Sequence, residues 1–282
     1  MMRLTGIFRS PLYSPGRHGE NDRLILEETA DVLLRSGCEV DLVHESHLAA
    51  APIVAETIFS MCQGREANER LMQLEEDGRL IINRPAAVLG CCRVHLARAM
   101  GSADGLFPPT AVVSANAYAS PPPEFGPRDG PVWVKRAGAH ATCREDVVRV
   151  ETQAEYRNVL ADFSHRGIEA AAVQRHVVGT VVKFYGVAGE AFFRCYREDD
   201  MEVHPEEIVA SRSRIEALVR RIGLEVYGGD AVIGDDGRIW VIDVNDWPSF
   251  ACFRDEAALA IAQHIHRRAL GREEQALAIR RG

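Results

Sequence analysis

Short apolar runs and helically spaced apolar residues alternate along the first 84 residues. The short runs predict strands, because clusters of β-branched and aromatic residues between polar or glycine-containing segments are typical of buried strands. Leu26, Ala30 and Leu33 recur at helical spacing and Gly37 follows them, which predicts a helix that ends there. The expected strands span 4–8, 39–43, 56–61 and 80–82, and the expected helices span 22–36 and 66–77. This order predicts a parallel sheet, so we expect residues 1–84 to form a Rossmann-like lobe.

The remaining part of the chain mixes helices with paired strands. Pro85 opens a predicted helix that ends before Gly101, and Thr152 with Glu155 forms the capping-box pattern of another helix. Further helices are expected at 206–222 and 255–270, and strands at 132–138, 169–178, 181–187, 191–196, 227–233 and 238–244. We therefore expect an α/β protein built from α+β lobes. Its parts are the lobe 1–84, a linker helix with a central subdomain over 85–176, and a C-terminal subdomain over 177–282.

A predicted hairpin near the end of the chain carries polar side chains where a strand should be apolar. Its turn, at residues 234–237, places Asp230 roughly opposite Asp243, and Asn245 faces the same side as Asp243 because they are two residues apart. Two carboxylates and an amide oxygen suit Mg²⁺ or Mn²⁺. The alternative is a hairpin with solvated Asp residues beside its turn. That alternative explains Asp235 and Asp236, but it explains Asp243 poorly because Asp243 is embedded in an apolar run.

Composition draws attention to two residues. Among the 33 basic residues only Lys135 and Lys183 are lysines. Lysine that is retained in an arginine-rich chain suggests a need for a compact ammonium, which arginine does not replace. Lys135 lies in an apolar strand, so its ammonium requires either an acidic partner or a ligand anion such as a phosphate. The small residues 137–142 that follow, with His140, could bring N–H groups to a phosphate, although His140 by itself is more often a surface residue.

Two further segments carry candidate binding residues. Lys183 alternates with Tyr185 and faces the same side of a strand, and Arg194 and Arg197 follow, which suits a clamp on phosphate or carboxylate. Ordinary strand-surface charge is the alternative, and for Arg194 it is equally acceptable. Residues 174–177 end a strand and start a link whose backbone could meet the edge of a base.

Taken in order, these motifs resemble the ATP-grasp superfamily over nearly the whole chain. The resemblance implies an ATP-grasp fold with an N-terminal lobe, ATP held between two α+β lobes, and one or two Mg²⁺ ions. It implies that Lys135 contacts the α- and β-phosphates and that Lys183 and Arg197 meet the γ-phosphate or the acceptor. It places the adenine hinge at Gln174, Arg175, His176 and Val177, and the metal ligands at Asp230, Asp243 and Asn245. Arg93 stands where many members have a lysine on the linking helix.

Two branches of that superfamily compete. Carboxylate–amine ligases usually have Arg at the position of Lys183 and Glu at that of Asp243, whereas the inositol-trisphosphate kinase branch matches better at Lys183 and in the Asp-x-Asn motif. That kinase branch is also rich in Lys around its polyphosphate pocket, and this chain is not. We expect a ligase that activates a carboxylate as an acyl phosphate; a kinase acting on a hydroxyl and a nucleotide-binding module without turnover are the alternatives. Acceptor candidates are Tyr13, Arg17, His18 and Ser249.

Charge and cysteine usage narrow the partners. The net charge of −8 argues against nucleic acid or an anionic membrane as a partner and leaves a small anionic substrate, with a homo-oligomer possible. No apolar run approaches the roughly 20 residues that span a bilayer. The seven cysteines are scattered without a Cys-x-x-Cys pair, which predicts reduced thiols in a cytoplasmic protein.

Overall fold

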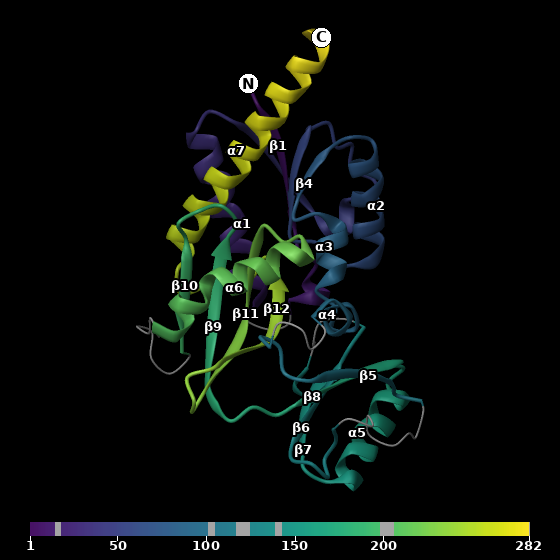
Figure 1. Cartoon of the computed structure of the whole chain (residues 1–282). Helices are drawn as coiled ribbons and strands as arrows, with labels where there is room; N and C mark the ends of the chain where they lie inside the picture. Colours follow the sequence, from purple (N-terminus) through teal and green to yellow (C-terminus); the bar gives the residue numbers. More distant parts are fainter. Residues whose placement is uncertain (15–17, 101–104, 117–124, 139–142, 198–205, 282) are drawn as a thin grey trace.

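The structure, a computed structural model, has three four-stranded sheets that follow one another along the molecule. It describes residues 1–282 except 15–17, 101–104, 117–124, 139–142, 198–205 and 282. The N-terminal sheet lies at the top of Figure 1, the C-terminal sheet in the middle and the central sheet at the bottom. The order of the three sheets in space therefore differs from their order in the sequence. Both ends of the chain lie in the N-terminal lobe.

The N-terminal sheet is parallel, as the strand–helix–strand pattern predicts. Its strand order is β2-β1-β3-β4. The strands are β1 (Arg3–Phe8), β2 (Glu39–His44), β3 (Thr57–Ser60) and β4 (Leu80–Ile82), and the helices are α1 (His18–Arg35) and α2 (Arg65–Glu76). Short 3-10 turns, Pro11–Tyr13 and Glu45–His47, follow β1 and β2. Helix α1 begins four residues before the expected start at Asp22, whose carboxylate instead accepts hydrogen bonds from Arg9 and Ser14.

The expected linker helix over 85–100 is divided into α3 (Pro85–Gly90) and α4 (Arg93–Met100). The break has a visible cause. The N–H group of Val94, which an unbroken helix would direct to the carbonyl of Gly90, donates instead to the carbonyl of Ala137 in the central part of the chain at 3.2 Å. The prediction of one continuous helix is wrong at this point, and the break makes Arg93 the first residue of α4.

The central sheet is antiparallel, with the order β5-β8-β6-β7. It consists of β5 (Thr110–Ser114), β6 (Val132–Arg136), β7 (Val147–Val150) and β8 (Ala170–Arg175), with a 3-10 turn, Arg144–Asp146, before β7. Helix α5 (Gln153–His165) covers one face and begins with the predicted capping box of Thr152 and Glu155. The sequence pattern missed β5 and β7, which are short and exist through their pairing with β8 and β6.

The C-terminal sheet is antiparallel, with the order β10-β9-β11-β12. Its strands are β9 (Gly179–Val187), β10 (Phe193–Tyr196), β11 (Val226–Gly234) and β12 (Ile239–Asp246). Helix α6 (Glu206–Ile222) packs on one face, where Phe184, Tyr227 and Val241 belong to one buried cluster. The opposite face carries Lys183 and Asp230, which are register partners on β9 and β11. The face beneath α6 is therefore core, whereas the opposite face buries Tyr185 and Val187 near the N-terminal lobe and has the partly buried Lys183 and Asp230 further along.

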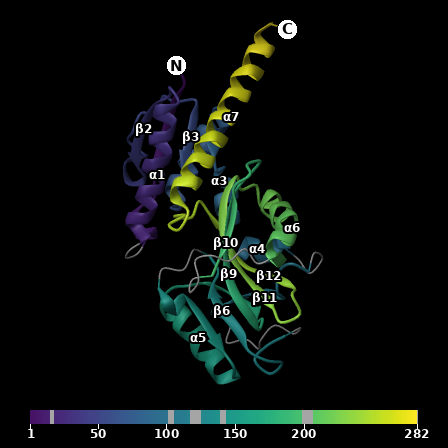
Figure 2. The same cartoon turned by 90° about the vertical axis from the view of Figure 1, so that its left-hand side faces the viewer.

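Two features hold the C-terminal sheet to the N-terminal lobe. Helix α7 (Arg254–Arg281), which runs beyond its expected end at residue 270, leaves the C-terminal sheet and packs along α1, as Figure 2 shows. The buried Asn83 accepts hydrogen bonds from the N–H groups of Glu225 and Val226 at 2.7 and 2.8 Å and donates to the carbonyl of Val226 at 2.7 Å. Hence one side chain completes the hydrogen bonding at the start of β11.

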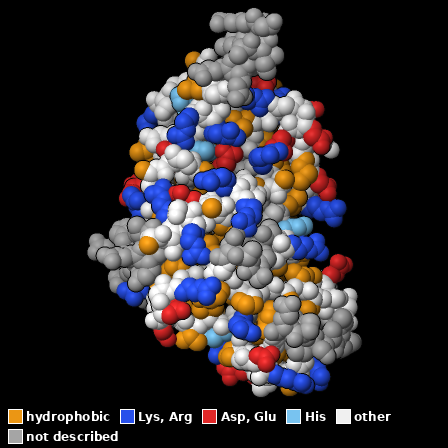
Figure 3. Space-filling model, in the orientation of Figure 1, with side chains coloured by type: hydrophobic (Ala, Val, Ile, Leu, Met, Phe, Trp, Pro, Cys, Tyr) orange, Lys and Arg blue, Asp and Glu red, His pale blue; other side chains and the backbone are white. Residues whose placement is uncertain are grey.

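Arginine side chains gather on the face that carries α6 and α7 (Figure 3). Several arginines of α6 and α7 form ion pairs with glutamates, so their charge is partly neutralised: Arg212 with Glu216, Arg267 with Glu190, and Arg268 with Glu225. Among the described residues, no helix combines the length and hydropathy that crossing a bilayer requires.

Candidate functional site

The two predicted metal-binding aspartates lie opposite each other on the hairpin. Asp230 of β11 pairs in register with Asp243 of β12, and Asn245 pairs with Gly228 two positions further along. The pairing that the turn predicts is therefore confirmed. All three polar side chains are partly buried rather than fully exposed.

A β-bulge decides which way these side chains face. The register shifts between Asp230 and Ala231, so that Asp230 pairs with Asp243 while Ala231 pairs with Val241, and Ile242 is the extra residue. Val241 and Val244 both belong to the core beneath α6 although they are three residues apart. Without the bulge, Val241 and Asp243 would share a face. The bulge therefore directs Asp243 away from the core and leaves the carbonyl of Ile242 outside the ladder.

Lys135 meets the hairpin at this bulge. Its ammonium donates to the carbonyl oxygen of Ile242 at 3.0 Å and to Oε1 of Gln174 at 2.8 Å. The residue is only 5% exposed, and burial, with a smaller effect of Arg93, lowers the Lys135 pKa from 10.5 to about 8. Among the described residues, Lys135 forms no ion pair with a carboxylate, although the nearby negative charges of Asp243 and Asp230 partly oppose the lowering of its pKa. A buried ammonium that faces neutral oxygens favours an incoming anion.

Arg93 joins the same group from α4. Its guanidinium forms an ion pair with Asp243 through Nη2 and donates to the carbonyl oxygen of Arg136 through Nη1 at 3.0 Å. Both side chains of the ion pair are largely buried, at 12% and 15% exposure. The sequence singles out Arg93 only as a departure from a family lysine, and the break between α3 and α4 that brings it here was not predicted. We call Arg93, Lys135, Lys183, Asp230, Asp243 and Asn245 the inter-sheet site.

The second lysine pairs with the other aspartate. Lys183 Nζ lies 3.1 Å from Oδ1 of Asp230, its register partner. Burial raises the pKa of Asp230, and the nearby charge of Asp243 raises it further, whereas Lys183 lowers it. A carboxylate whose pKa is raised by a second carboxylate beside it is a suitable environment for a divalent cation, which removes the repulsion between them.

The donor set fits a hard divalent cation. Asp230, Asp243 and Asn245 offer only oxygen ligands, and they lie at adjacent register positions of one hairpin. Within the described part of the chain there is no cluster of three or more His, Cys, Asp or Glu that could hold a metal. The candidate is therefore two carboxylates and an amide, a set that suits Mg²⁺ or Mn²⁺ bound together with a phosphate-bearing molecule rather than a self-sufficient cage.

The predicted hinge lies at the end of β8, beside Lys135. Gln174 accepts from Lys135 and donates through Nε2 to Thr110 Oγ1 at 3.1 Å. The N–H groups of Arg175 and His176 donate to the carbonyls of Pro109 and Pro131 at 2.9 and 3.0 Å. These two N–H groups therefore already have acceptors within the protein. The groups that remain for the predicted contact with a base are those of Val177 and the backbone carbonyls of the link. The His176 ring accepts from Trp133 Nε1 at 3.1 Å with Nδ1.

The contacts of the remaining candidates do not join them to the inter-sheet site, and some of these candidates lie outside the described residues. Arg194 shares a face with Lys183, but its guanidinium pairs with Glu256 of α7 and lies over Phe192, so its contacts do not support the predicted catalytic role. Arg197 follows β10 directly and is half-buried. Ser249 is half-buried in the loop after β12. Arg17 and His140 lie outside the described residues, and His18 is described only as the first residue of α1.

Tyr13 lines an open cavity of about 500 Å³ at the carboxyl ends of β1, β2 and β3. Arg65 and Arg70 of α2 also line it, and Glu45 accepts hydrogen bonds from the N–H groups of Ser10 and Gly64 at 2.6 and 2.7 Å. Ligands of open α/β sheets bind at this edge, where the strand order reverses. The position is consistent with the acceptor role that the sequence predicts for Tyr13.

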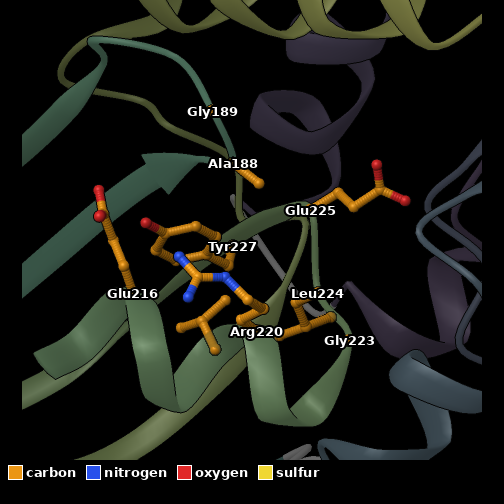
Figure 4. A pocket seen from close by; sticks show the side chains of 9 residues that line it. Ala188, Gly189, Glu216, Arg220, Gly223, Leu224, Glu225 and Tyr227 are labelled. Carbon is orange, nitrogen blue, oxygen red and sulfur yellow. The ribbon is translucent and has the colours of Figure 1, made fainter. Parts of the chain in front are cut away.

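A second cavity, of about 230 Å³, lies on the α6 side of the C-terminal sheet (Figure 4). Tyr227, Glu216 and Arg220 line it together with Glu225, whose carboxylate pairs with His264 and Arg268. Tyr227 belongs to the core face of β11, opposite Asp230. This cavity is therefore separate from the inter-sheet site.

Solved structures share the fold of this chain over nearly its whole length. D-alanine–D-alanine ligase from Bacillus anthracis complexed with ATP superimposes with a TM-score of 0.71 at 12% identity, covering 98% of this chain and 100% of that one. A RimK domain ATP-grasp protein from Sphaerobacter thermophilus gives 0.66 at 24% identity, covering 93% and 99%. The ATP-grasp ligase PsnB, complexed with a minimal precursor, gives 0.63 at 14% identity, covering 94% and 99%.

The class of structure is therefore defined: this α/β chain has the ATP-grasp fold, as its motifs predict. No protein-family model and no curated protein matches the sequence. At the identities of these structural neighbours the likeness concerns the fold, and the chemistry has to be argued from the chain's own residues.

Proposed function

We propose that this protein is an ATP-dependent ligase that joins a small carboxylate to an amine. The main support is Lys135, a buried ammonium whose hydrogen-bond partners among the described residues are neutral oxygens and which lies beside the Asp230–Asp243 pair. An anion that also brings a divalent cation, such as the triphosphate of ATP, would complement both features at once. The ligase descriptions of structural neighbours support the same choice.

In this proposal the chain's residues act mainly by positioning and by neutralising charge. Lys135 holds the α- and β-phosphates, while Lys183 and Arg197 lie toward the γ-phosphate or the acceptor. Asp230, Asp243 and Asn245 hold Mg²⁺, which supplies charge neutralisation on the phosphate oxygens. The carboxylate of the acceptor attacks the γ-phosphorus and ADP leaves; the amine then attacks the carbonyl carbon of the acyl phosphate and inorganic phosphate leaves. Tyr13 and Ser249 are acceptor candidates, as are Arg17 and His18.

One observation weighs against the alternative of a kinase for phosphorylated polyols. Such a kinase needs cations around its acceptor, and Arg9 is one of the few basic residues in the loop after β1. The Arg9 side chain is only 8% exposed and donates to Asp22 at 2.9 Å, to the carbonyl of Met61 at 3.1 Å and to that of Trp247 at 3.0 Å. Arg9 therefore joins loops of the protein and has little capacity left for a polyphosphate.

The deciding experiment identifies products. Purified protein is supplied with ATP, Mg²⁺ and pooled carboxylates, with and without pooled amines, and both phosphate release and new masses are followed. A ligase releases phosphate only when a carboxylate and an amine are both present, and an amide forms. A stable phosphate ester would identify a kinase. Nucleotide binding without ATP consumption across the pools would favour a binding module without turnover.

A further inference from the structure

Both carboxylates of the proposed metal set already have cationic partners from the chain itself. Arg93 forms an ion pair with Asp243, and Lys183 lies 3.1 Å from Asp230. The partners come from different elements: Arg93 begins α4, whereas Lys183 lies on β9 beside Asp230. Asp243 therefore receives a counter-charge from a residue outside its own sheet.

Charge balance shows what these pairs do to an incoming metal. With Lys135, the described residues of the inter-sheet site include three cationic side chains and two carboxylates, so these five side chains together carry an excess of one positive charge. A divalent cation arriving alone would add two more positive charges in a partly buried space, and it would have to displace Arg93 from Asp243. A polyphosphate reverses this balance, because it brings several negative charges for which Arg93 and the two lysines are natural partners.

We propose that Arg93 is an internal counter-ion that occupies Asp243 and excludes divalent metal until a nucleotide triphosphate draws its guanidinium away. Metal and nucleotide then bind with positive coupling, and the protein does not hold metal tightly by itself. This inference rests on the proposed function, since it takes the ligand to be a nucleotide triphosphate. It assigns Arg93 the role of a competitor that the metal must displace from Asp243.

A purely structural role for Arg93 makes the opposite prediction. Arg93 also donates to the carbonyl of Arg136 at 3.0 Å, so it connects the central sheet to β12. If the residue only fixed Asp243 in place, its removal would loosen the metal ligands and weaken metal binding. If it occupies the metal's place, its removal strengthens the binding of metal alone.

The test uses the full chain freed of metal by chelation, with Mn²⁺ as an electron-paramagnetic-resonance probe and a methylene-bridged, non-hydrolysable ATP analogue. Mn²⁺ is titrated with and without the analogue into wild type, Arg93→Met and Arg84→Met. Arg84 is the matched control, because it pairs with Glu75 at the start of α3 and lies outside the inter-sheet site. Asp243→Asn identifies the binding that belongs to this site.

We expect the analogue to tighten Mn²⁺ binding to wild type and to Arg84→Met by about 5- to 150-fold, the usual range of coupling between two ligands. Arg93→Met should bind Mn²⁺ alone at least about 5-fold more tightly than wild type, with a coupling reduced by the same factor. Equal Mn²⁺ affinity of wild type with and without the analogue would overturn the proposal, and this measurement does not depend on any variant folding. Unchanged or weaker binding of Mn²⁺ alone by folded Arg93→Met would overturn it as well.

The outcomes distinguish a failure of the proposed function from a failure of the role proposed for Arg93. If the wild-type protein binds neither the analogue nor Mn²⁺ in a way that Asp243→Asn removes, the proposed function itself fails. If both ligands bind at Asp243 but Arg93→Met leaves the coupling unchanged, the proposed function stands and only the role of Arg93 is lost.

Discussion

The ammonium of Lys135 lies 3.0 Å from the carbonyl oxygen of Ile242, the residue that the bulge displaces from the β11–β12 ladder. The contact joins the central sheet to the C-terminal sheet through one charged hydrogen bond. Because the partner is neutral, the bond itself supplies no counter-charge, and burial, partly opposed by the nearby Asp243, lowers the Lys135 pKa to about 8. This relationship has consequences for ligand binding and for stability.

Nucleotide binding should take up a proton in mildly alkaline solution. The Lys135 pKa is about 8 in the free protein, and a phosphate next to the ammonium would raise it, so between the two values the complex holds a proton that the free protein lacks. Calorimetric titration of ATP near pH 8.5, in two buffers that differ in ionisation enthalpy, measures this uptake. Lys135→Met should abolish the uptake and weaken ATP binding by about 1–3 kcal/mol. ATP affinity equal to that of wild type would remove Lys135 from the site.

The same residue should make the ligand-free fold more stable as the pH rises. The folded-state pKa of about 8 lies below the ordinary value of 10.5, so between these values the unfolded chain binds more protons and the free energy of unfolding rises with pH. The contribution approaches about 1.4 kcal/mol per pH unit and ends above pH 10.5. Urea unfolding of wild type and Lys135→Met at pH 7.5 and pH 9.5 measures the contribution of Lys135, because the other titratable groups are the same in the two proteins. A stability difference between the two proteins that does not change with pH would contradict a Lys135 pKa lowered by burial.

Asp243 should be essential for turnover and dispensable for folding. Asp243→Asn keeps the shape and a hydrogen-bonding group toward Arg93, yet it removes one of the two charged ligands of the proposed metal. We expect ATP consumption to fall by about 10²-fold or more, the usual size of losing a principal electrostatic group, with an unchanged circular dichroism spectrum. Asp235→Asn, in the exposed turn of the same hairpin, is the control and should retain wild-type activity. Activity of Asp243→Asn with Mg²⁺ near the wild-type level would contradict the assigned role.

The sequence predicted the parts of this site that depend on local rules. The turn at 234–237 fixes the register of Asp230 against Asp243, and glycine stops and the capping box mark helix ends. These features depend on residues close together in the chain. The same reasoning reaches the fold, because the order of strands and helices limits the possible sheets.

Arg93 and Ile242 show why the rest could not be predicted. The direction of the Arg93 side chain depends on the break between α3 and α4. A hydrogen bond from Val94 to Ala137 stabilises that break, and these two residues are 43 positions apart in the sequence, so no local pattern reveals it. The bulge at Ile242 left one trace in the sequence, since Val241 and Val244 cannot both face the core of a regular strand. Strict alternation would have placed Asp243 on the same face as Val241. The sequence therefore predicted that Asp243 faces Asp230, but it did not predict the bulge that makes this possible.

Asn83 should contribute strongly to stability, because its side chain makes all three of the hydrogen bonds described above with the start of β11. Asn83→Ala would remove the acceptor of the N–H groups of Glu225 and Val226, whereas the carbonyl of Val226 keeps the N–H of Trp247, and we expect the free energy of unfolding to fall by about 2–4 kcal/mol. Asn158→Ala, on the exposed face of α5, is the matched control and should change stability by no more than about 0.5 kcal/mol. Equal midpoints of urea unfolding for the two variants would show that Asn83 does not fix the N-terminal lobe to β11.

Lys183 and Arg194 share one face of the C-terminal sheet, but their partners predict different effects on catalysis. Lys183 contacts Asp230, whereas the guanidinium of Arg194 pairs with Glu256. Lys183→Met should reduce kcat by about 10²-fold, because it removes a positive charge beside the transferred phosphoryl group, and it should change ATP affinity much less. Arg194→Ala should change kcat by less than about 3-fold, since its surface ion pair contributes little. Steady-state kinetics of both variants, once an acceptor is known, distinguish the residues. A loss of kcat in Arg194→Ala as large as that in Lys183→Met, with Glu256→Ala unaffected, would place Arg194 in the catalytic machinery after all.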